Sequence, residues 1–318
     1  MIGLGTGGFD SLFRINFLEI LRIVACRWEV DQRLIKGGAD QIPLRLWSDT
    51  SQSSHWGSMS VRRLNNGCPR SAVKEIYVPD DPSRKVLITE RNGEVRPYDA
   101  VLISCSLRAL EMDIKINRSA FTDDVWTAIH NIYMINSSKV FVRTRTAFWK
   151  HQNPSQTLTC TITDEATRGT YLFDFEDTPS GVICLSYTWG DSSVKFNALS
   201  HEERVECCIR ILEKVYGRDL ISKQALESVS ICWEDISGYN GAFKLTQPGQ
   251  YTYQQSLFQQ PFTPSPKQHN GIFLSGETTS WAGGWIEGAF QSGLDAAMAI
   301  VEKLGGKVNS SETVRKFR

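Results

Sequence analysis

The closing segment of the sequence, residues 271–303, constrains the fold more than any other stretch. A short apolar run, Ile272–Leu274, predicts a buried strand, and a Gly-Glu turn and a tryptophan-containing loop follow it. A helix is predicted to begin after the glycine pair Gly283–Gly284. The first turn of a helix offers backbone N–H groups and a partial positive charge, and glycines let a ligand approach the backbone closely. The segment therefore indicates an α/β layer with an anionic or electron-rich ligand at a helix start, although an ordinary connection can share this pattern.

Composition is that of a globular protein of one large or two modest domains. The chain has 318 residues, of which 41% are hydrophobic and 22% are charged. Lys and Arg number 35, as do Asp and Glu, so the zero net charge predicts no nucleic-acid partner. A membrane span needs roughly 18–20 consecutive apolar residues, and no stretch is that long. The N-terminus also lacks a secretory signal pattern, so we expect a cytoplasmic protein with no membrane association.

The cysteines and histidines do not form a recognisable pattern. Eight cysteines lie mostly in apolar strings, without a Cys-x-x-Cys motif, and the five histidines are scattered. We therefore predict reduced, buried thiols and no metal site.

The first third of the chain predicts a helix, a short helix and a group of strands. Residues 10–28 have helical apolar spacing, and Ile42–Trp47 predicts a short helix with Pro43 in its first turn. The predicted strands are Val73–Val78, Lys85–Glu90 and Tyr98–Ser104. Asn92-Gly93 predicts a hairpin between the second and third strands, and the apolar run to Ser104 predicts a strand buried on both faces.

The middle of the chain predicts an antiparallel sheet with helices. A helix is predicted over Asp123–Ile132, and another runs from the capping box Ser200–Glu203 to Tyr216. Strands are predicted near Ser138–Arg143, Thr157–Thr163, Thr170–Phe173 and Val182–Tyr187. Residues 244–270, rich in Gln, Pro, Thr and Ser, predict a long active-site or surface loop. The fold class is therefore α/β and α+β, with one layer assembled from separated pieces and a mixed insertion between them.

Gly3–Gly8 matches the G-x-G-x-x-G motif of dinucleotide-binding turns and precedes a helical pattern. That motif must follow a strand of about five residues, and only Met1 and Ile2 come before it. An NAD-linked enzyme is therefore the weakest of the functional hypotheses.

Several segments of the sequence together resemble one family, the flavin amine oxidases. They are Gly3–Phe9, Gly37–Pro43, Tyr98–Ser104 with Leu107–Leu110, Ser137–Phe141 with Phe148-Trp149, Tyr239–Gly249, and the closing segment. The branch most similar is the bacterial tryptophan 2-monooxygenases. The resemblance implies an incomplete FAD-binding domain, Rossmann-like and of amine-oxidase type, with an inserted mixed-sheet substrate domain. The implied FAD-binding domain comprises residues 30–110 and 265–305, the substrate domain 1–29 and 111–264, and the tail 306–318.

The resemblance also implies roles for individual residues in binding FAD. The cofactor-binding residues it implies are Val73, Gly276, Glu277, Gly284, Trp285 and Ile286. Val73 resembles the residue whose backbone meets the adenine, and Gly276 with Glu277 matches the motif beside the pyrophosphate and ribityl groups. Trp285 and Ile286 match the helix-start residues that reach the pyrimidine end of the isoalloxazine ring.

Four residues are implied in catalysis. Trp285 corresponds to an aromatic wall facing the flavin, with ordinary core packing as its alternative. Tyr239 and Phe243 are candidates for the opposite wall. Relatives place a lysine shortly before the Phe-Trp pair, water-bridged to flavin N5, and Arg145 takes the apparent position of that lysine. Because an arginine stays charged and accepts no proton easily, reduced activity is one expectation.

The implied reaction is the FAD-dependent oxidation of the α-amine of an L-amino acid, with an aromatic substrate favoured and O2 as the second substrate. A monooxygenase would form indole-3-acetamide, CO2 and water from tryptophan, as in tryptophan metabolism and auxin biosynthesis. An oxidase would release the imino acid and H2O2. The family's first βαβ unit has no counterpart in this sequence. A catalytically impaired truncated homologue therefore stays open, as do a homodimer and a separate N-terminal FAD-binding segment as partners.

Overall fold

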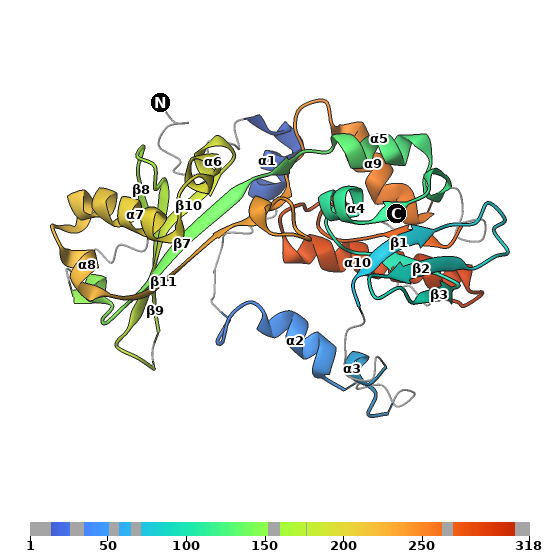
Figure 1. Cartoon of the computed structure of the whole chain (residues 1–318), viewed down its shortest axis with the longest axis horizontal. Helices are drawn as coiled ribbons and strands as arrows, with labels where there is room; N and C mark the ends of the chain where they lie inside the picture. The colour runs from blue at the N-terminus through green and yellow to red at the C-terminus, as the bar shows by residue number, and fades with distance from the viewer. Residues whose placement is uncertain are drawn as a thin grey trace.

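The computed structural model describes residues 14–25, 35–50, 57–64, 71–151, 160–175, 177–262 and 270–308. Gly3–Gly8, the first residues of the strand expected near Thr157 and most of the tail lie outside these ranges. Figure 1 shows an elongated molecule with two groups of elements. Residues 137–232 form the group on the left, and residues 73–132 with 251–303 form the group on the right.

A four-stranded sheet lies in the right-hand group, in the order β3-β2-β1-β5. Its strands are β1 (Val73–Tyr77), β2 (Val86–Glu90), β3 (Val95–Tyr98) and β5 (Lys115–Ile116). The hairpin at Asn92-Gly93 is confirmed, since Gly93 has a φ of 89° and its N–H donates to the Glu90 carbonyl. The predicted second arm of the hairpin was wrong. Its strand is β3, which ends where the predicted strand Tyr98–Ser104 was to begin.

The rest of the predicted strand Tyr98–Ser104 belongs to a separate parallel pair. β4 (Val101–Ile103) pairs with β13 (Ile272–Leu274), and Leu102 lies opposite Phe273. This pairing confirms that the closing segment joins a distant part of the chain. Burial on both faces was wrong, because Leu102 is 39% exposed and β13 is the only neighbour of β4 among the described strands.

Helices cover these strands and share one apolar core with them. They are α4 (Leu107–Asp113), α5 (Asp123–Asn131) and α9 (Tyr251–Gln259). Thr122 caps α5 as predicted, because its hydroxyl accepts from the N–H of Val125. The predicted loop at 244–270 was wrong in part, since α9 occupies its middle and buries Leu257 against α5. Tertiary burial, rather than helix propensity, stabilises a Gln- and Thr-rich helix such as this one.

A five-stranded antiparallel sheet forms the left-hand group, in the order β11-β7-β10-β9-β8. Its strands are β7 (Ser137–Thr144), β8 (Cys160–Ile162), β9 (Gly169–Asp174), β10 (Gly181–Trp189) and β11 (Ala225–Cys232). The antiparallel arrangement is confirmed, while β11 was not predicted. The helices of this group are α6 (Asp191–Asn197), α7 (His201–Tyr216) and α8 (Leu220–Gln224). The capping box of α7 is confirmed, with Ser200 and Glu203 hydrogen-bonded reciprocally.

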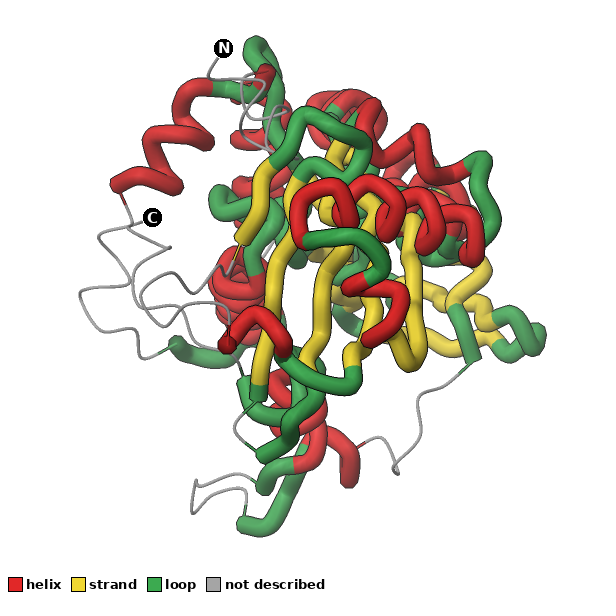
Figure 2. The backbone as a smooth tube through the Cα atoms, turned by 90° about the vertical axis from the view of Figure 1, so that its left-hand side faces the viewer, coloured by secondary structure: helices red, strands yellow, loops and turns green. Residues whose placement is uncertain are grey.

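The two faces of this sheet differ. Helices lie across one face (Figure 2), where Ile183 and Leu185 of β10 and Leu212 of α7 are fully buried. Side chains alternate along β7, so Lys139 lies on the face opposite to the buried Val140 and Val142. Tyr187 is the cross-strand partner of Lys139 and lies on the same half-buried face, because a register shift between Cys184 and Ser186 reverses the alternation along β10. We call this opposite side the open face.

The remaining elements connect or flank these groups. They are α1 (Phe17–Ala25), α2 (Gln41–Ser48), α3 (Val61–Leu64), the pair β6 (Met134–Ile135) and β12 (Phe243–Lys244), α10 (Ile286–Lys303), and, within the described ranges, four short 3-10 segments at Arg118–Ala120, Phe148–His151, Trp233–Asp235 and Gln260–Phe262. The short helix with Pro43 in its first turn is confirmed as α2. The division into cofactor and substrate domains stays a prediction, and α5 and α9, assigned to the substrate domain, pack in the core of β1 and β2.

No helix within the described ranges is long and apolar enough to cross a membrane. No group of three or more potential metal ligands gathers in the same ranges.

Candidate functional site

The loop between β13 and α10 brings the predicted helix opening to the surface. α10 begins at Ile286, and its N-cap residue Trp285 is extended and provides no side-chain cap. Trp285 is 37% exposed and Ile286 is 51% exposed. The positive end of an 18-residue helix is therefore flanked by exposed apolar side chains instead of packed protein.

Glycine at position 284 is required by a close approach. Gly284 has a φ of 78°, in the left-handed region, and a Cβ there would lie 3.0 Å from the ring of Phe243. The loop can therefore lie directly against β12, which places Phe243 beside the opening of α10.

Aromatic rings continue from Phe243 onto the open face of the sheet. The ring centroids of Phe243 and Trp189 are 5.2 Å apart, and those of Trp189 and Tyr187 are 5.6 Å apart. The Nζ atom of Lys139 lies 4.4 Å from the ring centroid of Tyr187. We call Phe243, Trp189, Tyr187 and Lys139 the aromatic row. Its cation, Lys139, was missed at the sequence level, although strand alternation with the buried Val140 and Val142 could have indicated its face.

Glu277 points into the protein. Its carboxylate accepts hydrogen bonds from the N–H of Gly284 at 2.7 Å and from the N–H of Lys244 at 3.3 Å. Burial raises the pKa of this carboxyl above its usual value, while these N–H donors oppose the shift. Glu277 thus binds its own loop and β12, and its place beside the pyrophosphate and ribityl groups stays a prediction.

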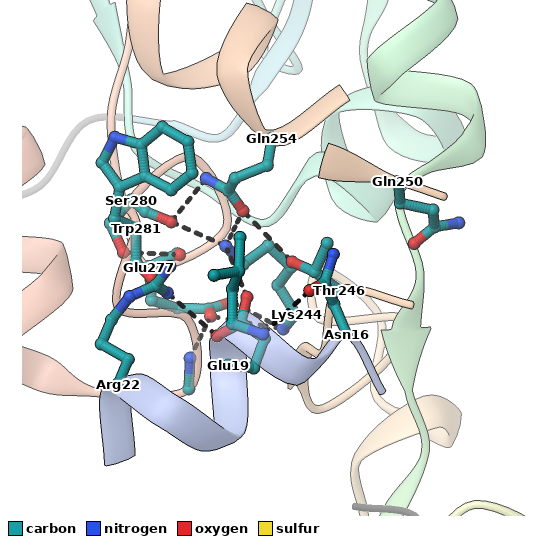
Figure 3. Close-up of polar contacts among 12 residues, drawn as sticks. Asn16, Glu19, Arg22, Lys244, Thr246, Gln250, Gln254, Glu277, Ser280 and Trp281 are labelled. Atoms are coloured by element: carbon teal, nitrogen blue, oxygen red, sulfur yellow. Dashed lines mark hydrogen bonds and ion pairs between the residues drawn. The ribbon is translucent and has the colours of Figure 1, made fainter. Parts of the chain in front are cut away.

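A buried polar cluster lies under the same loop (Figure 3). The Nζ atom of Lys244 donates to Gln254 Oε1 and, at 2.7 Å, to the carbonyl of Ser280. It lies 4.0 Å from Glu19 Oε1 of α1. Burial lowers the pKa of Lys244 to about 8, against the opposing attraction of Glu19 and Glu277.

Val73 and Tyr239 lie elsewhere, Val73 in the right-hand group and Tyr239 in a segment that contacts that group at Ser106. Val73 begins β1 and lines an apolar groove of about 570 Å³ that also contacts Ile103 and Gly238. Tyr239 follows Gly238, is 51% exposed, and its ring packs on Trp233 with centroids 5.4 Å apart. Its carbonyl accepts from the hydroxyl of Ser106, at the start of α4. The structure therefore places Val73 and Tyr239 near one groove, and Tyr239 is not in the aromatic row.

Arg145 is separated from the other candidates. It is exposed and follows the last residue of β7, where its backbone N–H donates to the carbonyl of Gln224. The other end of β7, at Ser137, pairs with Trp189 of the aromatic row. At about 3.3 Å per residue, β7 places Arg145 roughly 25 Å from that end. The structure thus brings Phe243, Gly284 and Trp285 together and leaves Arg145 out.

Comparison with known proteins gives the family. The profile of the family described as flavin containing amine oxidoreductase matches residues 2–301. The chain belongs to this family. The description of the family confirms the predicted flavin as the family's cofactor and names oxidoreductases, while the activity of this chain stays a prediction. The tryptophan 2-monooxygenase of Pseudomonas savastanoi is 33% identical over 323 residues, which cover 97% of this chain and 55% of the relative.

Other relatives agree with this result. The tryptophan 2-monooxygenase of Allorhizobium ampelinum is also 33% identical, over 97% of this chain and 42% of its own length. The chain thus spans about half the length of the curated relatives it matches. The structure of cyclohexylamine oxidase from Brevibacterium oxydans IH-35A has a TM-score of 0.64 at 16% identity and covers 95% of this chain and 64% of that one. This likeness confirms the predicted fold class of amine-oxidase type.

Proposed function

We propose that this chain provides the flavin-ring contact and substrate face of an FAD-dependent enzyme that oxidises the α-amine of an L-amino acid. The observation that carries the proposal is the exposed opening of α10, at Trp285, next to the aromatic row. An aromatic substrate is favoured because flat rings stack on such a row. The names of the similar proteins favour a tryptophan 2-monooxygenase outcome, and an oxidase releasing imino acid and H2O2 is the alternative.

The residues present fit FAD. The hydroxyl of Thr278, in the loop before α10, is buried and has no hydrogen-bond partner. A buried polar atom normally has a hydrogen-bond partner, so a group of the bound ligand would supply the one that this hydroxyl lacks. The exposed start of α10 suits the electron-rich end of a flavin ring. The groove beside Val73 is apolar and open enough for an adenine.

Bound FAD would supply the redox chemistry, accepting a hydride from the substrate. The protein's own residues bind, orient and exclude water. Trp285 and Ile286 would hold the pyrimidine end through their backbone, and Phe243 and Trp189 would form the wall that keeps water out. We propose Lys139 for the role first assigned to Arg145. A lysine can give up and take back a proton, whereas a guanidinium stays charged. The exposed position of Arg145 then gives no reason to expect lost activity.

Reconstitution tests the proposal. The chain is purified with FAD, both alone and fused behind the N-terminal half of the Pseudomonas savastanoi relative. The absorbance of bound flavin is recorded between roughly 350 and 500 nm. We expect flavin uptake by the fusion, bleaching by L-tryptophan without oxygen, and an amide product when oxygen is admitted. Imino acid and H2O2 would select the oxidase alternative. A fusion that folds but takes up no flavin would refute the proposal, and saturable NADH binding by the chain would revive the NAD hypothesis.

A further inference from the structure

Lys244 is an unusual residue for the interior of a protein. It belongs to a two-residue strand, β12, and only 1% of its surface is exposed. Lysine is rarely buried without partners, because desolvation of an ammonium group is costly. Its neighbour Phe243 belongs to the aromatic row, so one short strand contributes both to that row and to the buried polar cluster.

The partners of Lys244 come from three elements that are far apart in the sequence. Gln254 lies on α9, Glu19 lies on α1, and the carbonyl of Ser280 belongs to the loop before α10. Gln254 also donates to the Ser280 carbonyl at 2.7 Å. Two buried side chains therefore converge on one carbonyl of that loop (Figure 3).

The same loop is held at both of its ends. Glu277 accepts from the backbone N–H of Lys244 and of Gly284, which closes the loop on itself and on β12. On the far side, Arg22 of α1 donates to the carbonyl of Trp281, and its side chain pairs with Glu19 at 3.0 Å. The charges that face Lys244 are thus Glu19, Glu277 and Arg22, and with Lys244 they sum to zero.

We propose that Lys244 is a positioning residue that fixes the loop Glu277–Gly284, and with it the opening of α10, relative to Phe243 and the rest of the aromatic row. The loop-holding part depends on the contacts alone. The consequence for FAD binding rests on the proposed function.

Stability alone does not account for a lysine at this position. An apolar side chain of similar size would fill the space without the desolvation cost, and such replacements of buried charges are often neutral or stabilising. An apolar side chain would, however, leave the Ser280 carbonyl with one donor fewer. Unlike an apolar side chain, Lys244 donates directed hydrogen bonds, and these hold the loop in one position.

Hydrogen exchange of the flavin-free chain tests the loop-holding part. In Lys244→Met we expect amides of residues 278–288 to exchange about tenfold faster, while those of α7 keep their wild-type rates. The matched control is Lys223→Met, which removes an exposed lysine that lies 3.6 Å from Asp219. In this variant, the amides of residues 278–288 should exchange at the wild-type rate. Unchanged exchange in the Lys244→Met loop, or equal acceleration throughout the chain, would overturn the proposal.

A second variant covers the case in which Lys244→Met does not fold. Gln254→Leu keeps the buried charge and removes the other donor to Ser280. We expect a roughly threefold acceleration confined to residues 278–288. Wild-type exchange in this variant would contradict the convergence of both side chains on the loop.

Flavin titration of the fusion protein tests the consequence of the loop position for FAD binding. We expect Lys244→Met to raise the FAD dissociation constant about tenfold, the factor that about 1.4 kcal/mol represents, and to shift the flavin absorbance spectrum. Lys223→Met should change neither. Faster loop exchange with an unchanged flavin affinity would overturn the positioning role. A wild-type fusion that binds no flavin would refute the proposed function, while hydrogen exchange would still decide the loop-holding part.

Discussion

The chain contains two buried regions of opposite character. Behind the five-stranded sheet, the interior is apolar, and Ile183, Leu185 and Leu212 have no exposed surface. Under the loop before α10, the interior is polar, and Lys244 and Gln254 are each 1% exposed. Apolar burial gains free energy roughly in proportion to area, whatever the orientation of the side chain. A buried polar group gains only when each partner stands in the right direction. The apolar region therefore sets stability, and the polar region sets geometry.

The largest effect is expected from a truncation in the apolar region. Ile183→Ala should lower the free energy of unfolding by about 2–5 kcal/mol, because it leaves a cavity between β10 and the helices. Urea denaturation measures the change. Val229→Ala on β11 is the control, since Val229 is 60% exposed and its loss should cost under about 0.5 kcal/mol. Equal losses for both variants would show that this face of the sheet is not the stabilising one.

Most of the apolar region could be predicted from the sequence. The run Val182–Tyr187 predicts a strand by its apolar content, and Ser200–Glu203 predicts the start of α7 by its capping box. The exception is β11, an edge strand whose side chains are mainly exposed or half-buried. A strand that buries few side chains carries little alternation, so its pattern was too weak to detect.

A pH-dependent contribution to stability should distinguish the polar region from the apolar one. The pKa of Lys244 in the folded protein is about 8, below the ordinary 10.5, so between these values the unfolded chain binds a proton that the folded chain does not. The contribution of Lys244 to the free energy of unfolding therefore rises with pH across this window, by roughly 3 kcal/mol at most. We expect the stability of wild type relative to Lys244→Met to rise accordingly. Urea denaturation of both proteins at several pH values measures this difference, and parallel profiles would exclude the titration.

The polar region could not be predicted from the sequence. Lys244, Gln254 and Glu19 are residue types that usually lie at the surface, and nothing in linear order joins them. α9 was expected to be loop, so Gln254 had no predicted place. The prediction of Arg145 depended on linear order in the same way. Arg145 was selected by its closeness to Phe148-Trp149 along the chain, although it follows the end of β7 that lies away from the aromatic row.

Two glycine substitutions compare the regions directly. A Cβ at Gly181 would overlap the Trp149 ring, and overpacking of this kind should cost about 1–3 kcal/mol of global stability. A Cβ at Gly283 would overlap the Lys244 side chain and lie 3.0 Å from its carbonyl. We expect Gly283→Ala to displace the Lys244 amine from its partners and mainly to accelerate exchange in residues 278–288, at a similar cost of about 1–3 kcal/mol. Calorimetry and hydrogen exchange measure both. Identical behaviour of the two variants would remove the distinction between the regions.

The smallest effect is expected outside both regions, at Arg145. Because this side chain is exposed, Arg145→Ala should change the free energy of unfolding by under about 0.5 kcal/mol and leave flavin reduction unchanged. Lys139→Met is the informative partner. It removes a half-buried cation next to Tyr187 and should slow flavin reduction in the reconstituted enzyme by about 100-fold if the amine handles a proton. Stopped-flow reduction by L-tryptophan compares the two variants. A large loss in Arg145→Ala with none in Lys139→Met would mean that the far end of β7, and not the aromatic row, faces the reacting flavin.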